Sequence, residues 1–158
     1  MSRYYINQNF SFRDRFRITN ENQEDVFFAE GEFLSFGKKI RLYTMDGEEL
    51  LFIKEQVFKF LSQYDFYIGE QLVGEMKKEL SFFKARYTML QPDWTIQGDL
   101  WSHHYEIKDG QQLVAVIRKK VFSFMDAYEI EVYEEDFVEI VLGIVIAIDA
   151  DLAKDQDA

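Results

Sequence analysis

Two adjacent histidines, His103 and His104, are the only histidines in this chain of 158 residues and the first candidates for catalysis or metal binding. Neighbouring residues of a β-strand point to opposite faces, so the pair is poorly placed to hold one metal ion. Ser102 precedes His103, but adjacent residues of one strand do not give a nucleophile and its base a usable geometry. The chain has no cysteine, no ligand-like spacing of carboxylates and no glycine-rich phosphate loop. The sequence therefore predicts no catalytic residue, no metal site and no cofactor.

Glu139 is the other residue with chemical interest, because it interrupts an apolar segment near the C-terminus. A charged carboxylate in a dry core is costly unless it is paired. We favour the interpretation that Glu139 lies in the first turn of a helix, near the mouth of the fold, and is met by a lysine or arginine. The alternative is a catalytic acid whose pKa is raised by burial.

Lysine and arginine gather in four groups, against an overall formal net charge of −11. Basic side chains beside exposed aromatic residues could hold an anionic phospholipid headgroup, each contributing about 1 kcal/mol near a charged membrane. Alternatively, they are ordinary strand residues that protect edges or pair with some of the 29 acidic residues. The groups are Arg13, Arg15 and Arg17; Lys38, Lys39 and Arg41; Lys77, Lys78, Lys84 and Arg86; and Arg118, Lys119 and Lys120. As lipid- or anion-binding residues we predict Lys77, Lys78, Lys84, Arg86, Arg118, Lys119 and Lys120.

The composition limits the class of protein. Aromatic residues make up 17% of the chain, which favours strands, and the single proline and eight glycines argue against disorder. The acidic balance disfavours long-range attraction to nucleic acid or anionic membranes. The N-terminus lacks the apolar region of a signal peptide, and no apolar run reaches the length of about 20 residues that a membrane span needs. We expect a cytoplasmic protein without a transmembrane segment, either free or peripheral at a membrane, and the oligomeric state stays open.

Short segments with strand-like alternation fill most of the chain, with turn residues between them. Asp46-Gly47 and Asp109-Gly110 predict hairpin turns, since glycine accepts the positive φ of tight turns. The pattern Val57-Phe58-x-Phe60 returns as Val121-Phe122-x-Phe124, and the Asp-Gly turns repeat in the same order, which indicates two similar halves. The predicted strands are Tyr4–Phe10, Arg15–Thr19, Val26–Phe33, Lys38–Thr44, Leu50–Gln56, Gln63–Ile68, Gln71–Glu79, Arg86–Gln91, Trp94–Trp101, His104–Lys108, Leu113–Lys120 and Ala127–Tyr133.

The segment Phe137–Ile148 is apolar except at Glu139 and Gly143, so as a helix it must be buried on every side. Twelve strands spaced ~4.8 Å apart and tilted by ~40° close into a barrel of radius about 12 Å, which holds one helix. We predict a mainly β fold, a twelve-stranded closed antiparallel barrel that encloses a C-terminal hydrophobic helix at about 135–150. The domain covers 1–150, and 151–158 form a disordered acidic tail. Solvent-facing aspartates are expected at Asp149, Asp151, Asp155 and Asp157.

Small residues on the strands and on the helix are expected to let the two approach each other. The thin stripe of the helix is Glu135, Glu139, Gly143 and Ala147. Inward-facing strand positions are predicted at Phe27, Ala29, Gly31 and Phe33; at Leu72, Gly74 and Met76; and at Trp94, Ile96, Gly98 and Leu100.

Several motifs together resemble the LURP-one-related family, including its bacterial members. They are Trp94-x-Ile-x-Gly98, Tyr105-Glu-Ile-x-Asp-Gly110, Lys119-Lys-Val-Phe-Ser-Phe124-x-Asp126-x-Tyr128 and Ala147-Ile-Asp149. The resemblance spans roughly Tyr4 to Asp149 and implies the fold of the tubby C-terminal domain and the phospholipid scramblases, a twelve-stranded barrel around a helix. Where the family has Trp-Phe-Ser-Trp-Gly-Asp-Thr-Tyr, this chain has Val121 and Phe124 in place of tryptophan and Met125 in place of glycine. These changes are apolar throughout and fit a packing role. Tubby-like relatives bind phosphoinositides through basic surface residues, but no position carries over.

These observations support three hypotheses on function. The favoured one is a non-enzymatic binding module that contacts an anionic phospholipid headgroup or a partner protein through basic surface residues. The alternative is a small-molecule binder or hydrolase that uses a surface cleft. A third, suggested by the scramblases, is insertion of the apolar helix into membranes, and the short length of that helix argues against it.

Overall fold

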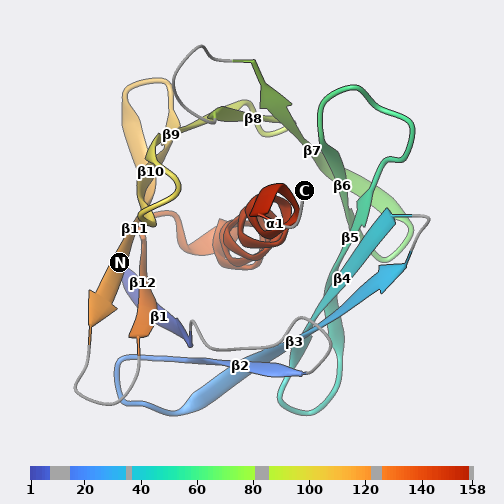
Figure 1. Cartoon of the computed structure of the whole chain (residues 1–158). Coiled ribbons are helices and arrows are strands. Elements are labelled where there is room, and N and C mark those ends of the chain that lie inside the picture. Colours follow the sequence, from blue (N-terminus) through green and yellow to red (C-terminus); the bar gives the residue numbers. More distant parts are fainter. Residues whose placement is uncertain (8–14, 35–36, 81–85, 122–125, 157–158) are drawn as a thin grey trace.

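A barrel of twelve strands surrounds one helix in the computed structural model, which describes residues 1–7, 15–34, 37–80, 86–121 and 126–156 (Figure 1). The first six strands are β1 (Ser2–Asn7), β2 (Phe16–Thr19), β3 (Asp25–Leu34), β4 (Gly37–Thr44), β5 (Glu49–Glu55) and β6 (Gln63–Ile68). The other six are β7 (Gln71–Glu79), β8 (Arg86–Leu90), β9 (Trp94–Asp99), β10 (His104–Asp109), β11 (Gln112–Val121) and β12 (Asp126–Val132).

Each strand pairs antiparallel with its neighbours in sequence, and β1 pairs with β12 to close the barrel. The closing register runs from Ser2 opposite Val132 to Asn7 opposite Ala127. This architecture confirms the predicted fold class. Strand bounds differ slightly from the prediction: β1 ends at Asn7, and the predicted residues 8–10 lie outside the described part. Strand β9 stops at Asp99, whose side chain accepts a hydrogen bond from the Ser102 N–H and shapes the turn.

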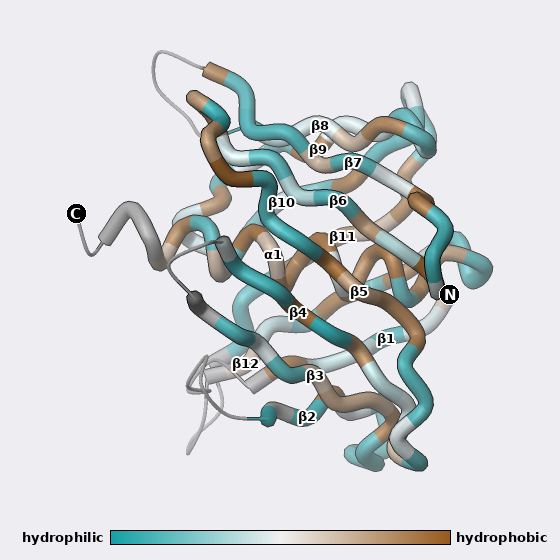
Figure 2. Tube along the Cα trace, turned by 90° about the vertical axis from the view of Figure 1, so that its right-hand side faces the viewer, coloured by the Kyte–Doolittle hydropathy of each residue, from teal (hydrophilic) through white to brown (hydrophobic). Residues whose placement is uncertain are grey.

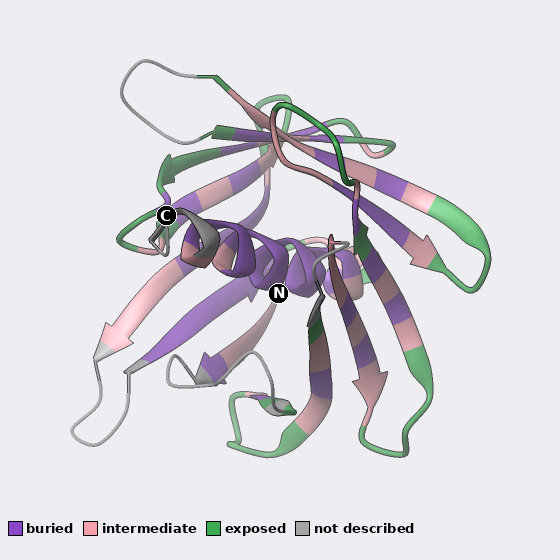
Figure 3. Ribbon diagram, turned by 45° about the vertical axis from the view of Figure 1, so that its right-hand side comes forward, coloured by how far each residue is buried: buried purple, intermediate pink, exposed green. Residues whose placement is uncertain are grey.

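The helix fills the barrel. A short 3₁₀ turn, η1 (Glu135–Phe137), leads into α1 (Val138–Gln156), which is buried nearly all round in Figure 3. Val141, Leu142 and Ile144 are fully buried among inward-facing strand residues such as Phe66 and Ile130. Burial of this apolar surface, at about 25 cal/mol per Å², is the main force that holds the helix in place.

Gly143 marks the closest approach of α1 to the wall, as the thin stripe predicts. A Cβ atom on Gly143 would lie 2.5 Å from Leu51 Cδ2 and 3.0 Å from Ile53 Cδ1, both on β5. Glu139, on the same stripe, is half-buried in the first turn of α1. No lysine or arginine ion pair is found for Glu139 among the described residues, so the expected cationic partner is not seen.

The predicted disordered tail was wrong over 151–156, the part of it that the structure describes. The helix continues to Gln156 instead of ending near 150, and Asp151 has an exposed fraction of only 1%. Asp149 is also largely buried instead of solvent-facing. The physical reason is that tyrosines from the barrel wall donate hydrogen bonds to both carboxylates, which the chain composition alone does not reveal. The side chains of Asp155 and Asp157 lie outside the described residues.

One predicted inward position, Leu72, was also wrong. Leu72 is 41% exposed, because the pairing of β6 with β7 shifts at a β-bulge. Phe66 lies opposite Gly74 but Tyr67 lies opposite Leu72, so Val73 is the extra residue and the alternation reverses before it. Gly98 is exposed but lies on the inward face, opposite the buried Tyr105 of β10. Buried as predicted are Ala29, Gly74, Met76, Trp94, Ile96 and Leu100.

The two ends of the barrel differ in composition. Because consecutive strands pair, the connections alternate between the end where α1 begins and the end where it stops, as the side view in Figure 2 shows. We call the first the acidic end, formed by residues 20–24, 45–48, 69–70, 91–93, 110–111 and 133–134. We call the second the aromatic end, formed among the described residues by Arg15, 56–62, Leu80 and 100–103.

Candidate functional site

Strand alternation separates the predicted basic residues into inward and outward sets. On β7, Met76 is buried inside, so Lys78 faces inward and Lys77 outward. On β11, Ile117 is buried inside, and Lys119 faces inward opposite Tyr128. The outward side chains at this end are therefore Lys77 and Arg86 on one part of the wall, and Arg118 and Lys120 on another. Lys84 lies outside the described residues.

The outward set is neither contiguous nor free of acidic partners. Strands β9 and β10 separate the β7–β8 pair from β11. Arg118 Nη1 lies 2.8 Å from Glu131 Oε1, and Lys120 Nζ lies 3.8 Å from Glu129 Oε1. Arg86 Nε lies 3.6 Å from Glu79 Oε2. The structure therefore does not bring the six described residues of the predicted set together into one patch.

The inward lysines belong to a polar layer that closes the core at the aromatic end. We call this layer the polar collar, and it consists of Lys38, Ser62, Tyr64, Lys78, Tyr87, His103, Lys119, Tyr128, Asp149 and Asp151. Lys38 Nζ donates a hydrogen bond of 2.5 Å to the Ala150 carbonyl, near the end of α1. Ala150 lies six residues before the end of α1, so this bond ties the helix to β4 inside the barrel. The collar therefore anchors the last turns of the helix.

Asp151 is the best-satisfied member of the collar. The Tyr64 and Tyr87 hydroxyls donate to its two carboxylate oxygens at 2.9 and 2.5 Å, and Lys78 Nζ lies 3.6 Å away. Burial alone would raise the pKa of this carboxyl. Hydrogen bonds from Ser62, Tyr87 and Tyr64, together with the charge of Lys78, outweigh burial and hold the pKa of Asp151 below its ordinary value.

Asp149 lies two residues earlier and has the opposite electrostatic character. Its one described hydrogen bond comes from the Tyr128 hydroxyl at 2.9 Å. Burial raises the pKa of Asp149 from 3.8 to about 6, and the Tyr128 bond opposes this only in part. Asp149 is therefore a carboxylate that the fold holds ionised at neutral pH against a desolvation penalty.

His103 extends this group toward solvent. Its Nε2 atom lies 3.3 Å from the Tyr128 hydroxyl, and the two rings are 4.3 Å apart at their centroids. Burial, followed by the charge of Lys119, lowers the pKa of His103. His104 is exposed on the outer wall, so the two histidines do not converge, as predicted. Within the described residues, no group of three or more histidine, aspartate or glutamate side chains is placed to hold a metal ion.

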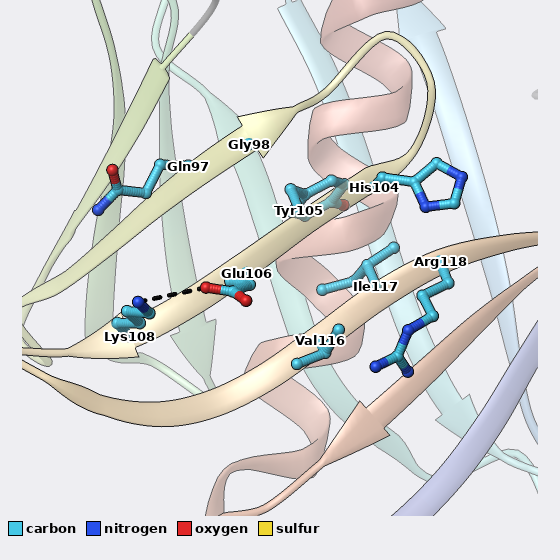
Figure 4. A pocket seen from close by; sticks show the side chains of 9 residues that line it. All are labelled: Gln97, Gly98, His104, Tyr105, Glu106, Lys108, Val116, Ile117 and Arg118. Atoms are coloured by element: carbon cyan, nitrogen blue, oxygen red, sulfur yellow. Dashed lines mark ion pairs between the residues drawn. The ribbon is translucent and has the colours of Figure 1, made fainter.

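An open groove of about 500 Å³ runs along β10 on the outer wall (Figure 4). Gly98 contributes no side chain there, and Val116 contributes a short one. Lys108 Nζ pairs with Glu106 Oε2 at 3.3 Å inside the groove, while Arg118 points toward Glu131 of β12. The groove is a polar surface feature in which the charged side chains already have partners.

Among the described residues, the three most exposed apolar side chains, Phe58, Phe60 and Leu80, lie at the aromatic end. Others, such as Met45 and Ile68, are partly exposed at or beside the acidic end. Phe58 and Phe60, in the connection between β5 and β6, have exposed fractions of 101% and 92%, and Lys59 stands between them. Leu80 follows β7 with an exposed fraction of 77%, and Trp101 lies half-exposed between β9 and β10. The matching Phe122-x-Phe124 motif and the Phe10-Ser-Phe12 motif lie outside the described residues.

Comparison with known proteins agrees with the fold. A model of the family described as LURP-one-related matches residues 2–149. The chain belongs to the LURP-one-related family. An uncharacterised protein of Bacillus subtilis, YxjI, is 31% identical over 148 residues, covering 94% of this LURP-one-related chain and 91% of the relative. An X-ray structure of a protein from Arabidopsis thaliana superposes with a TM-score of 0.67 at 16% identity, covering 95% of this chain and 91% of the other.

The structure adds one further finding about membranes. In the part of the chain that the coordinates describe, no helix combines the length and the apolar character required of a membrane span.

Proposed function

We propose that this LURP-one-related protein is a non-enzymatic binding module that docks on an anionic phospholipid surface through its aromatic end, as a peripheral protein facing the cytoplasm. The observation that carries the proposal is the separation of charge between the two ends of the barrel. The connections of the acidic end contain Glu21, Glu24, Asp46, Glu48, Glu70, Asp93 and Glu134 and no lysine or arginine.

The aromatic end has the opposite charge. Its described connections carry Lys59 and Arg15 and no acidic residue, and Arg15 is paired with Glu30 of β3 at 2.8 Å. Lys39 and Lys77 lie on the outer wall close to that end. A negative surface would therefore repel the acidic end and attract the aromatic end, which orients the molecule despite its net charge of −11. Seven of the 29 acidic residues lie in the connections of the end that would face away from the membrane.

A lipid surface fits this end better than a partner protein. The exposed side chains Phe58 and Phe60 project from one connection, and Leu80 and Trp101 project from two others. Apolar side chains that project separately, with a lysine between two of them, suit a lipid surface, because lipid molecules can rearrange around each side chain. A protein partner would require one continuous complementary surface.

The proposal is tested by sedimentation of the full chain with vesicles. We expect the protein to pellet with vesicles of phosphatidylglycerol and phosphatidylcholine in equal parts, and much less with phosphatidylcholine alone. Binding should weaken as salt rises above about 0.1 M, where the Debye length falls below about 10 Å. Equal pelleting with both vesicle types would contradict the role of charge.

A matched pair of variants locates the binding surface. Lys59→Glu and Lys108→Glu change the net charge equally, but Lys59 lies at the aromatic end and Lys108 in the groove along β10. We expect Lys59→Glu to weaken binding to the anionic vesicles by roughly tenfold, because about 1 kcal/mol is lost with the lysine and more with the added negative charge. Lys108→Glu should bind within about twofold of the wild type. Equal losses would place the contact elsewhere.

The groove supports the second candidate, a small-molecule binder or hydrolase. Its volume of about 500 Å³ would admit a small ligand. Its carboxylate, Glu106, is paired with Lys108, which is the arrangement of an ordinary surface ion pair and favours binding over catalysis. A small molecule that raises the melting temperature of the wild type, but not of Val116→Trp, would favour this candidate.

A further inference from the structure

The connection between β5 and β6 has a rigid base and an exposed tip. The Gln56 N–H donates to the Gln63 carbonyl at 2.8 Å, which closes the base of the connection. The side-chain amides of both glutamines also donate to Asp65. Beyond this base, Val57, Phe58 and Phe60 are all exposed. The two phenyl rings therefore project from a connection whose base is fixed by hydrogen bonds.

Phe58 also has an unfavourable backbone conformation. Its φ is +62°, in the left-handed region that bulky side chains rarely adopt. Strain of this kind persists where the surrounding structure imposes it, and it is found most often at functional sites. The fully exposed ring gives the fold no packing contact in return. A benefit from a contact outside the chain would explain why phenylalanine occupies a position that suits glycine.

We propose that Phe58 and Phe60 insert into the acyl-chain boundary of an anionic bilayer while Lys59 remains at the level of the lipid phosphates. This inference rests on the proposed function and specifies how the surface is engaged. Aromatic rings favour the membrane interface, and a lysine flanked by them keeps its ammonium group in the headgroup layer. Leu80 and Trp101 follow on the next connections around the same rim, so the barrel would stand end-on with its acidic end toward solution.

Depth is the property that separates insertion from simple electrostatic attachment. The chain has no cysteine, so Phe60→Cys and Asp46→Cys each provide a single site for an environment-sensitive fluorophore. Asp46 lies in a connection of the acidic end and serves as the control. With vesicles of phosphatidylglycerol and phosphatidylcholine, we expect the label of Phe60→Cys to shift to the blue and to be quenched by nitroxides on the acyl chains. The label of Asp46→Cys should show neither change.

A second variant keeps the test independent of folding. The double variant Phe58→Gly, Phe60→Ser removes both rings and relieves the positive φ at position 58, so its thermal stability should equal or exceed that of the wild type. We expect its binding to the same vesicles to be at least about tenfold weaker, because the variant lacks the two phenyl side chains whose transfer from water into the bilayer favours binding.

The outcomes distinguish this inference from the proposed function. If the protein pellets with anionic vesicles but the label of Phe60→Cys stays in water, insertion is wrong and attachment through charge stands. If the protein pellets with no vesicle, both proposals are wrong. If the wild type forms a dimer in sedimentation equilibrium and the double variant does not, the rings contact a second copy of the chain and insertion is again wrong.

Discussion

Two aspartates on the same turn of α1 show how strongly local partners decide the role of a residue. Asp151 accepts hydrogen bonds from Tyr64 and Tyr87 and faces Lys78, whereas Asp149 has the single bond from Tyr128. One carboxylate is therefore stabilised as an anion and the other is not. Their substitutions should have opposite effects on stability.

Replacement of Asp151 by asparagine should destabilise the fold. The amide group would present a donor to a tyrosine hydroxyl, and Lys78 would lose its buried counter-charge. We expect a loss of about 3 kcal/mol in the free energy of unfolding at pH 7, in the range for breaking a buried ion pair. Urea unfolding followed by circular dichroism measures it. A loss within experimental error of zero would show that the collar does not hold the helix.

Replacement of Asp149 by asparagine should stabilise the fold at neutral pH. Asparagine keeps an acceptor for the Tyr128 hydroxyl and removes the buried charge. A pKa raised from 3.8 to about 6 corresponds to roughly 3 kcal/mol as an upper bound at 1.36 kcal/mol per unit. We therefore expect a gain of about 1–3 kcal/mol at pH 7.5 in the same urea experiment.

The pH dependence of the free energy of unfolding follows from the raised pKa of Asp149. A carboxyl whose pKa is higher in the folded state favours folding when protonated, so its contribution is present below pH 3.8 and is lost as pH rises through about 6. The stability difference between Asp149→Asn and the wild type should therefore shrink as pH falls from 7 to 4. Asp151, whose pKa is lowered, contributes above its unfolded pKa of 3.8 and loses that contribution as pH falls through its folded value. A difference independent of pH would contradict this account of Asp149.

At the scale of elements, the packing of α1 against β5 depends on one missing side chain. Gly143 lets the helix approach Leu51 and Ile53, where a Cβ atom would come within 2.5 Å and 3.0 Å of their terminal methyl groups. Glycine inside a helix is otherwise unfavourable by about 1 kcal/mol relative to alanine. The close contact must therefore outweigh the helix propensity.

We expect Gly143→Ala to destabilise the protein by about 1–2 kcal/mol, since overpacking costs about 1–3 kcal/mol and the better helix former returns about 1 kcal/mol. Thermal unfolding of the single variant and of the double variant with Leu51→Ala measures the coupling. The double variant should be more stable than the sum of the two single changes predicts, because the shortened Leu51 makes room for the new methyl group. Strict additivity would place the contact elsewhere on the helix.

The elements were predictable from the sequence because period-2 alternation is strong in most strands, and because an apolar segment such as Phe137–Ile148 must be enclosed. The β-bulge at Val73 was not predictable, since nothing in the local pattern distinguishes an extra residue from an ordinary one. The end of α1 was missed because aspartates read as solvated residues. Its signal was present in Tyr64, Tyr87 and Tyr128, which each occupy an inward position at the same end of three strands.

At the scale of the whole molecule, the candidate site depends on topology more than on any motif. Basic residues form compact groups in the sequence, but alternation turns Lys78 and Lys119 inward while Lys77 and Lys120 face outward. Local sequence does not report which connections share an end of the barrel. Once the strand order is known, each connection can be assigned to the acidic or the aromatic end. Phe58 and Phe60 are then the most exposed described side chains of the aromatic end.

The position of α1 after all twelve strands has a consequence for synthesis in the cell. The strands surround a helix that is synthesised after them, and the first strand can close the barrel only with the twelfth. Until then the nascent chain has an incomplete sheet whose apolar inner face is not yet covered by the helix. We expect this protein to engage holding chaperones throughout translation and to reach its native state only after release, in a single late step.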